Sequence, residues 1–390
     1  MTIKLSKPIL NIREKLSELD RPVGTHGSQL MRSNDAAESF DLIGAGRKNI
    51  IINGSMKVAQ RSTSEAITGY GYHTVDRFHT VANSSMSYAV TMSQESDNPD
   101  GLGKSVKLLT TTAKTPSGSE NYILRYKGEE QDITGAAFGT SKSKPVTVSF
   151  SVKSNKTGTY GFQMYLGNFN PNMTVAYTIN SKDTWERKTI TLPPYTTSYT
   201  HNSDGSVGFT LDWNLSSGPD DILTPFAWQT SSTAARGVTG QVNMLDTVNN
   251  YFQLTNVQLE IGPVATPFEH ITYGEEVALC YRYFRRFDST GGGDVYTGYG
   301  VGVPNAGNRM LWTNAFDVPM RTEPTISGAS VRLYDGTNNL AVTSFATNRS
   351  SKSAFWVEPT GDSSPLVVGR GCVIGNNNSS SGYVEFNAEL

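Results

Sequence analysis

The chain of 390 residues is poor in cysteine and in charge. Its two cysteines, Cys280 and Cys372, are too few for a disulfide framework or for a zinc site built from paired CxxC motifs, so we expect both to be buried as small apolar residues. Charged residues make up 17% of the chain, against about 25% in an average soluble domain, and the net charge is −2. Such a balance leaves no electrostatic footprint for nucleic acid, which we therefore exclude as a partner.

Long apolar runs are missing as well. No stretch of about 20 apolar residues occurs, so we predict no membrane insertion. Residues 1–20 carry mixed charges without an uninterrupted apolar segment and do not resemble a secretion signal. A polar, weakly charged chain without such a signal is typical of a protein that is made in the cytoplasm of a cell and released when the cell lyses.

The first segment contains a short amphipathic helix, with apolar residues separated alternately by three and four positions. These residues are Ile9, Ile12, Leu16 and Leu19. The spacing is that of a coiled-coil seam. Because a helix this short is marginal in water, we expect it to pack against its own copies, a later domain or a docking partner. We assign residues 1–48 to an N-terminal helical anchor and linker.

From residue 49 to residue 262 the apolar residues alternate with a period of two. Val146, Val148, Phe150 and Val152 lie on one face of a predicted strand, and runs of the same kind separated by turn-forming residues follow. Many short strands with one apolar face predict an all-β fold, a jelly-roll sandwich. Residues 263–289 are predicted to form a linker with a short helix at 273–284, and residues 290–390 to form a second, smaller β domain.

Catalytic and metal-binding motifs are not found in the sequence. The five histidines form no HxH or HExxH motif, and no GxSxG motif of a serine hydrolase occurs. We therefore predict that the chain is not an enzyme and has no catalytic residues, no metal site and no cofactor. A structural calcium ion is compatible with the composition, but no motif indicates one.

Aromatic and uncharged polar side chains suggest a binding role. A sugar presents apolar C–H faces and a rim of hydroxyls, so its site needs aromatic planes beside amide, hydroxyl or carboxylate groups. Gln163, Tyr165 and Asp212 point away from the apolar faces of their strands. If the two strands are neighbours, they form a polar surface with one aromatic plate.

The C-terminal domain adds four aromatic candidates near glycine-rich loops. They are Tyr296, Tyr299, Trp312 and Trp356. For each of them taken alone, burial in the core is the interpretation that the sequence favours, and only the set as a whole suggests a binding role.

Several stretches resemble a known family. Residues 49–61 with 72–78 resemble the opening of jelly-roll modules in bacteriophage tail-fibre and other virion proteins. Residues 183–192 and 252–262 resemble the late strands of carbohydrate-binding-module sandwiches. The most specific match to the phage proteins is residues 265–270 followed by 273–284; residues 317–325 and 384–390 resemble the usual end of such chains.

The resemblance implies a virion fibre protein, typically a homotrimer, whose jelly roll contacts host-surface glycans, and it leaves open whether the fibre lies on the tail or on the head. We favour the tail, with contact to other virion proteins through the N-terminus. The loops and aromatic residues of residues 290–390 lead us to place that domain at the distal tip. Two alternatives stay open: a head-fibre, decoration or adaptor protein without receptor binding, and a polysaccharide depolymerase.

Overall fold

The computed structural model describes residues 47–82, 89–167, 170–223, 227–230, 235–289, 294–347 and 349–390. One compact unit runs from Asn49 to Leu390. The predicted seam at Ile9, Ile12, Leu16 and Leu19 lies outside the described residues and stays a prediction. Among the described residues, no helix has the length and apolar character needed to cross a membrane.

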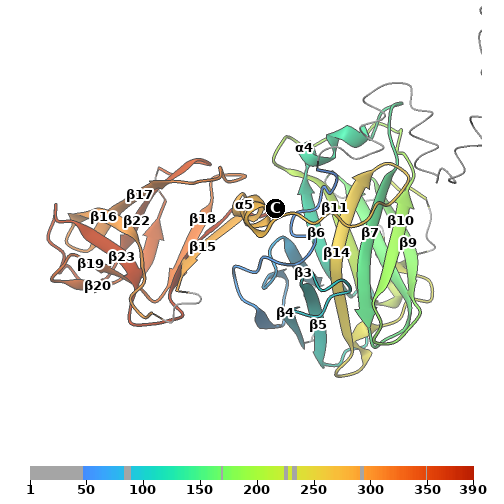
Figure 1. Cartoon of the computed structure of the whole chain (residues 1–390), viewed down its shortest axis with the longest axis horizontal. Helices are drawn as coiled ribbons and strands as arrows, with labels where there is room; N and C mark the ends of the chain where they lie inside the picture. Colours follow the sequence, from blue (N-terminus) through green and yellow to red (C-terminus); the bar gives the residue numbers. More distant parts are fainter. Residues whose placement is uncertain are drawn as a thin grey trace, which may run out of the picture. The chain divides into compact units, whose positions relative to one another are not determined.

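Residues 64–261 form two antiparallel six-stranded sheets, as the alternating pattern predicts (Figure 1). The first jelly-roll sheet has the order β1 (Ser64–Ile67), β4 (Ala89–Glu95), β5 (Ser105–Thr112), β14 (Tyr251–Ile261), β7 (Val146–Ser154), β10 (Glu186–Leu192). The second has the order β2 (Gly71–Tyr72), β3 (Phe78–Ala82), β6 (Asn121–Glu129), β11 (Val207–Ser217), β8 (Gly158–Leu166), β9 (Asn172–Ile179). The all-β jelly-roll sandwich is confirmed.

The core lies between these sheets and is rich in aromatic rings. Val146, Val148, Phe150 and Val152 are fully buried, which confirms the face predicted for their strand. Trp213 of β11 meets Phe150 of the opposite sheet with ring centroids 5.6 Å apart. The period of two therefore identifies the side of each strand that faces the core.

Short elements complete the jelly roll. They are α4 (Glu130–Ile133), η1 (Thr134–Ala136), η2 (Pro219–Asp221), η3 (Met244–Asp246) and the parallel pair β12 (Ile222–Leu223) and β13 (Gly237–Val238). The chain around β13 lies against the outer face of the second sheet, where Gln241 donates to Asn214 Oδ1 at 2.7 Å. A Cβ on Gly161 would lie 3.0 Å from the carbonyl oxygen of Arg236, so glycine allows this close approach.

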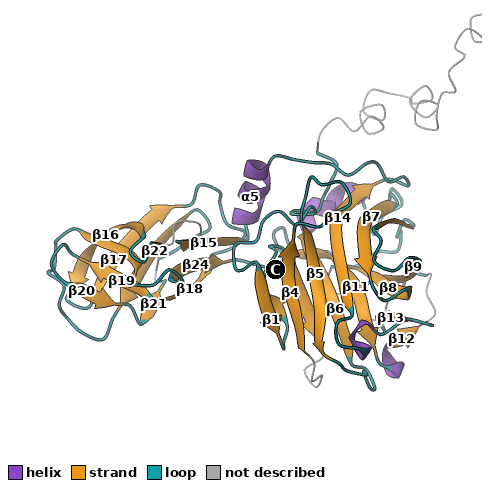
Figure 2. Cartoon of the chain, turned by 60° about the horizontal axis from the view of Figure 1, so that its bottom comes forward, coloured by secondary structure: helices purple, strands orange, loops and turns teal. Residues whose placement is uncertain are grey.

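A short helix and two further sheets follow the jelly roll (Figure 2). Helix α5 (Tyr273–Tyr281) is held by a capping box between Thr272 and Glu275, and the predicted helix is confirmed there. It ends before Phe284 because that residue pairs with Asn387 in a sheet.

The three-stranded sheet has the order β15 (Phe284–Asp288), β24 (Tyr383–Asn387), β18 (Thr325–Ala329). The seven-stranded sheet has the order β20 (Asn339–Ala341), β19 (Val331–Tyr334), β23 (Cys372–Asn376), β16 (Gly298–Ala306), β17 (Arg309–Ala315), β22 (Ala354–Thr360), β21 (Ser344–Ala346). Both cysteines are free and buried, as predicted. The domain boundaries drawn from the sequence stay predictions.

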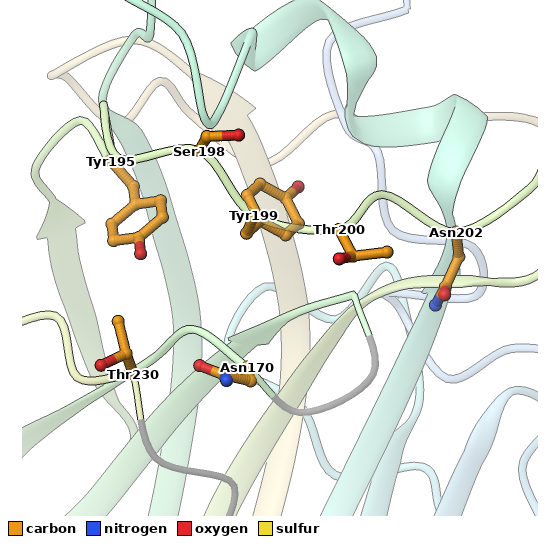
Figure 3. A pocket seen from close by; sticks show the side chains of 7 residues that line it. All are labelled: Asn170, Tyr195, Ser198, Tyr199, Thr200, Asn202 and Thr230. Atoms are coloured by element: carbon orange, nitrogen blue, oxygen red, sulfur yellow. The ribbon is translucent and has the colours of Figure 1, made fainter.

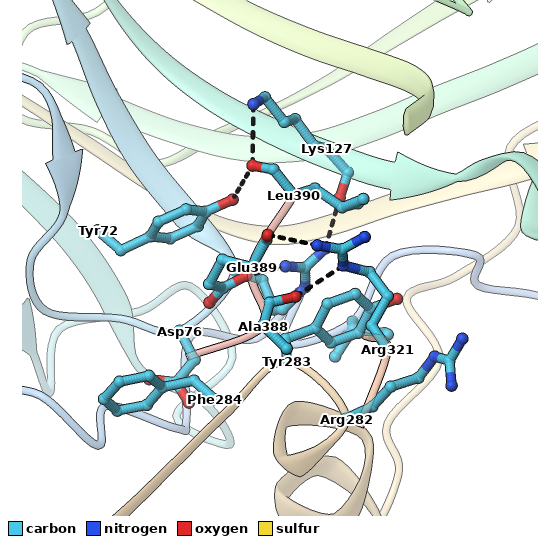
Figure 4. A network of polar contacts seen from close by, with 12 residues as sticks. Tyr72, Asp76, Lys127, Arg282, Tyr283, Phe284, Arg321, Ala388, Glu389 and Leu390 are labelled. Carbon is cyan, nitrogen blue, oxygen red and sulfur yellow. Dashed lines mark hydrogen bonds and ion pairs between the residues drawn. The ribbon is translucent and has the colours of Figure 1, made fainter. Parts of the chain in front are cut away.

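The last residues contact the jelly roll through a polar network (Figure 4). Arg321 donates to the carbonyl oxygens of Ala388 and Glu389, each at 2.7 Å. The Glu389 carboxylate forms an ion pair with Arg77, whose Nη2 also donates to the carbonyl oxygen of Lys127 at 2.6 Å. Arg77 is fully buried, so its charge depends on this network for compensation.

The turn between β9 and β10 predicts a dependence of stability on pH. Glu186 accepts hydrogen bonds from Lys188 Nζ at 2.5 Å and from the backbone N–H groups of Ser181 and Asn180 at 2.7 and 2.8 Å. Burial opposes ionisation, but these hydrogen bonds outweigh it and lower the pKa of Glu186 to about 2. A carboxyl whose pKa is depressed by folding stabilises the fold above its unfolded pKa and loses that contribution as the pH falls toward the folded value.

We therefore expect the free energy of unfolding to fall by about 1–2 kcal/mol between pH 5 and pH 2 through this group. Urea unfolding of the wild type and of Glu186→Gln between pH 5 and pH 2 tests this prediction. The unfolding free energy of the variant should lack the part of the pH dependence that comes from Glu186. Equal slopes in the two proteins would contradict the assignment.

Candidate functional site

Three predicted site residues are neighbours, but they are not accessible. Strands β8 and β11 pair directly, with Gln163 opposite Asp212 and Tyr165 opposite Thr210, so the predicted juxtaposition is correct. Their predicted exposure is wrong, because the exposed fractions of Gln163, Tyr165 and Asp212 are 0%, 1% and 0%. The alternation of apolar and polar residues shows that a side chain points away from the core, but it does not show whether that side chain is exposed to solvent.

The burial has two causes. Arg125 of β6 donates from Nε and Nη2 to the two carboxylate oxygens of Asp212, each at 2.6 Å. Gln163 Nε2 donates to the carbonyl oxygen of Ala235 at 3.2 Å, because the chain before β13 lies over this face. Burial also raises the pKa of Tyr165. These three residues therefore belong to a covered polar layer and not to an open binding surface.

The four aromatic candidates of the C-terminal domain have different fates. Trp312 is 2% exposed and packs against Phe355 in the core of this domain, which is the outcome that the sequence favours for each aromatic residue taken alone. It is therefore not part of an open binding surface. Tyr299 is half-buried, and its hydroxyl donates to the carbonyl oxygen of Gly382 at 2.7 Å. Tyr296 is 49% exposed and Trp356 is half-buried.

A cavity of about 510 Å³ lies at one end of the jelly roll (Figure 3). It is bordered by the connection from β10 to β11, by the connection from β8 to β9, and by the segment 227–230. The residues that line it are Asn170, Tyr195, Ser198, Tyr199, Thr200, Asn202 and Thr230. None of these described residues is acidic, and every one carries a hydroxyl or an amide group.

Aromatic rings form one side of this cavity. Tyr195 lies against Trp228, with ring centroids 5.4 Å apart, and against Tyr199 at 6.0 Å. Pro193 and Pro194 follow β10, and the carbonyl oxygen of Pro193 accepts the indole N–H of Trp228 at 2.9 Å. Proline has no backbone N–H to donate to a neighbouring strand. These two prolines therefore favour the end of β10 and the start of this loop.

Tyr199 has the features expected of a ligand contact. It is half-buried, its ring centroid lies 4.3 Å from that of His201, and its buried hydroxyl has no hydrogen-bond partner among the described residues. Burial raises the pKa of Tyr199, so the hydroxyl stays protonated and can donate. An unsatisfied hydroxyl in such a position is costly unless a ligand or water satisfies it.

Two features hold Tyr199 in place. Gly139 adopts a φ of +78°, and a Cβ there would lie 3.1 Å from the Tyr199 ring. His201 Nδ1 lies 2.7 Å from Oε1 of the buried Glu130 of α4. The Tyr199 ring thus packs between Gly139, which leaves room for it, and His201, which is anchored by Glu130. A ring that is already fixed loses less conformational entropy when a ligand binds.

The sequence analysis missed Tyr195, Tyr199 and Trp228. A signal was present, because two tyrosines four positions apart occur in the Ser/Thr-rich segment 193–201 after a predicted strand. Exposed loop aromatics among hydroxyl residues are candidates for ligand contact. Only the tertiary structure shows that Trp228 and Asn170 join them.

The comparisons with known proteins give structural likenesses at low identity. The sequence matches no family model and no curated protein. The enzymatically active domain of tailspike protein 4 from bacteriophage CBA120 matches over 55% of this chain and 21% of its own length, with 12% identity and a TM-score of 0.31. The chain thus spans about a fifth of that tailspike structure.

Carbohydrate-binding modules are among the other similar structures. A family 11 module from Clostridium thermocellum, in complex with a mixed-linked tetrasaccharide, matches over 52% of this chain and 98% of its own, with 10% identity and a TM-score of 0.27. A xylan-binding domain from Paenibacillus barcinonensis matches over 47% and 91%, with 13% identity and a TM-score of 0.24. TM-scores below 0.5 carry no argument about function, which has to come from the residues of this chain.

Metal ligands do not gather in the described ranges. No group of three or more His, Cys, Asp or Glu side chains there is arranged to hold an ion. The expectation that the chain needs no metal or cofactor stays a prediction.

Proposed function

We propose that the chain is a bacteriophage fibre protein that binds a host-surface glycan in the cavity beside Tyr199. The observation that carries the proposal is the composition of this cavity: tyrosine rings beside Ser, Thr and Asn side chains, with one buried tyrosine hydroxyl unpartnered among the described residues. Aromatic planes receive the C–H faces of a sugar, and hydroxyl and amide groups replace the water around its rim. The phage assignment rests on the sequence stretches at 49–61 and 265–284.

The chemistry of the site supports binding without cleavage. Hydrolysis of a glycosidic bond ordinarily uses two carboxyl groups on either side of the bond. Asp212 is held by Arg125, Glu129 by Arg282 at 2.6 Å, and no acidic residue lines the cavity among those described. We therefore propose a binding protein and not a depolymerase.

Several copies would act together. A cavity of this size holds only a few sugar units, and single-site affinity for so small a ligand is weak. Presenting linked copies raises the effective concentration of sites and hence the avidity. This supports a homotrimer on the virion, attached to other virion proteins through residues 1–48, with the tail as its place.

A tyrosine replacement tests the site. Tyr199→Ala should weaken glycan binding at least about tenfold, because both a stacking plane and a hydroxyl are lost. The measurement is binding of the full chain to an array of bacterial lipopolysaccharide and capsule fragments, followed by titration of the best ligand. Tyr70→Ala is the matched control, since Tyr70 is 80% exposed and does not line the cavity.

Tyr199→Phe separates the two contributions, because it keeps the ring and removes the hydroxyl. An intermediate affinity supports both roles. If Tyr199→Ala binds as tightly as Tyr70→Ala, the cavity is not the glycan site. If the wild type binds no fragment on the array, the head-fibre or adaptor alternative replaces the proposal.

A further inference from the structure

Arg332 lies between two exposed tyrosine rings on the outer face of the seven-stranded sheet. Its guanidinium carbon is 4.3 Å from the ring centroid of Tyr296 and 5.1 Å from that of Tyr334. The rings are 49% and 36% exposed. The hydroxyl of Tyr334 donates to the carbonyl oxygen of Gly336 at 2.9 Å, which fixes the ring. The arrangement presents a flat cation beside two aromatic rings.

Arg332 has no carboxylate partner among the described residues, unlike its neighbours in the same domain. Four other arginines of residues 284–390 form ion pairs there: Arg285 with Asp317, Arg286 with Asp288, Arg309 with Glu358, and Arg370 with Asp335. Arg321 donates instead to backbone carbonyl oxygens. Asp294 accepts the N–H of Tyr296 at 2.8 Å and forms no ion pair with Arg332. The guanidinium donors of Arg332 are thus available to a ligand.

A second arginine of this domain also lies beside an aromatic ring. Arg349 lies 4.8 Å from the ring centroid of Trp356 and also has no carboxylate partner among the described residues. The indole N–H of Trp356 is buried without a hydrogen-bond partner within that part of the chain. Trp356 pairs with Thr313 of β17, which is exposed. Its side chain therefore points away from the core, on the opposite side of the sheet from the buried Trp312.

Exposed valines continue the outer face of the sheet beside Tyr334, which pairs with Val373. Val301 is 71% exposed and pairs directly with Val373, which is 41% exposed, while Val303 is 47% exposed. A contiguous apolar patch of this kind marks an interaction surface.

We propose that this face binds an anionic saccharide, with Arg332 holding its carboxylate or phosphate group. The guanidinium fork matches either anion with two parallel hydrogen bonds, and the tyrosine rings and valines receive the C–H faces of the sugars. The inference rests on the proposed function only in taking a glycan as ligand, because it uses a different site. It also deepens that function, since a neutral cavity and a cationic face select different parts of a surface polysaccharide.

The charges disfavour a second copy of the chain as the occupant. A copy that used the same face would bring its own Arg332 toward Arg332 of the first copy, and the nearby Asp294 carboxylate already accepts the N–H of Tyr296 at 2.8 Å. Like charges without counter-charges oppose such an interface. An anionic ligand supplies the missing charge.

The test uses tetragalacturonate, its methyl ester and a phosphorylated tetrasaccharide with the full chain. We expect at least one acidic probe to bind, with a dissociation constant raised at least about tenfold by Arg332→Ala and by Tyr334→Ala. Arg370→Ala is the control, because it also removes an arginine of this domain, but one that is paired with Asp335 at 3.9 Å. The methyl ester should bind at least about tenfold more weakly than the acid.

The outcomes separate this proposal from the cavity. Loss of acidic-probe binding in Arg332→Ala, with unchanged binding of the best array ligand, supports the face, and loss of acidic-probe binding supports it even if Tyr199→Ala proves silent. Equal affinity of Arg332→Ala and the wild type for the acidic probes overturns it, as does equal affinity of the wild type for the acid and the methyl ester. Absence of binding to every saccharide overturns it too, including the case in which vesicles of anionic lipid bind instead.

Discussion

Glu389→Gln is expected to lower the free energy of unfolding by about 3–5 kcal/mol, because it leaves a buried guanidinium without its counter-charge. Arg77 is fully buried, and its guanidinium carbon lies 3.4 Å from the ring centroid of Tyr283. The Glu389 side chain is 4% exposed and pairs with Arg77 and, at 3.4 Å, with Arg61. Glutamine keeps the shape but removes the charge that compensates for two arginines.

Urea unfolding followed by tryptophan fluorescence measures the effect. Glu385→Gln is the matched control: Glu385 lies in the adjoining strand β24 and pairs with Arg286 at 3.6 Å, but is 22% exposed, so it should cost less than about 1 kcal/mol. The double variant Arg77→Met with Glu389→Leu should recover part of the loss, because no lone charge stays buried. Equal stability of Glu389→Gln and Glu385→Gln would show that the polar network around Glu389 does not stabilise the fold.

The jelly roll could be predicted because its information is local. Alternation of apolar and polar residues depends on the backbone geometry of a strand, so Val146, Val148, Phe150 and Val152 identified their own core face. Helix α5 was equally readable, since its Thr272–Glu275 capping box is a four-residue signal. Its end was not, because Phe284 leaves the helix to pair with a strand that begins about a hundred residues later.

The candidate site was only partly predictable, because accessibility is a property of distant contacts. The predicted pairing of the two strands correctly placed Gln163 beside Asp212. Arg125, which binds Asp212, and Ala235, whose carbonyl oxygen accepts from Gln163, are far from them in the sequence. Tyr296 follows a glycine-rich segment and is exposed, but its role in binding stays a prediction. Trp312 is buried, as the sequence favours for each aromatic residue taken alone.

Asp212→Asn is the substitution with the second large expected effect. It tests whether Asp212 stabilises the fold or binds the ligand. Asp212 is fully buried, and Arg125, which is 6% exposed, donates to both of its carboxylate oxygens. Burial alone would lower the pKa of the Arg125 guanidinium, but the charge and hydrogen bonds of Asp212 outweigh it and raise that pKa. Replacing the carboxylate by an amide leaves this cation buried against a neutral group, at an expected cost of about 3–5 kcal/mol of unfolding free energy.

The same variant decides between a structural and a ligand-binding aspartate. Because neither Asp212 nor Arg125 lines the Tyr199 cavity, the folded fraction of Asp212→Asn should bind glycan as the wild type does. Asp220→Asn, at an exposed position, should change the unfolding free energy by no more than about 0.5 kcal/mol. Unfolding curves and titration with the best array ligand give both quantities. Wild-type stability combined with lost glycan binding would return Asp212 to the binding surface and would mean that the chain around β13 can leave the sheet.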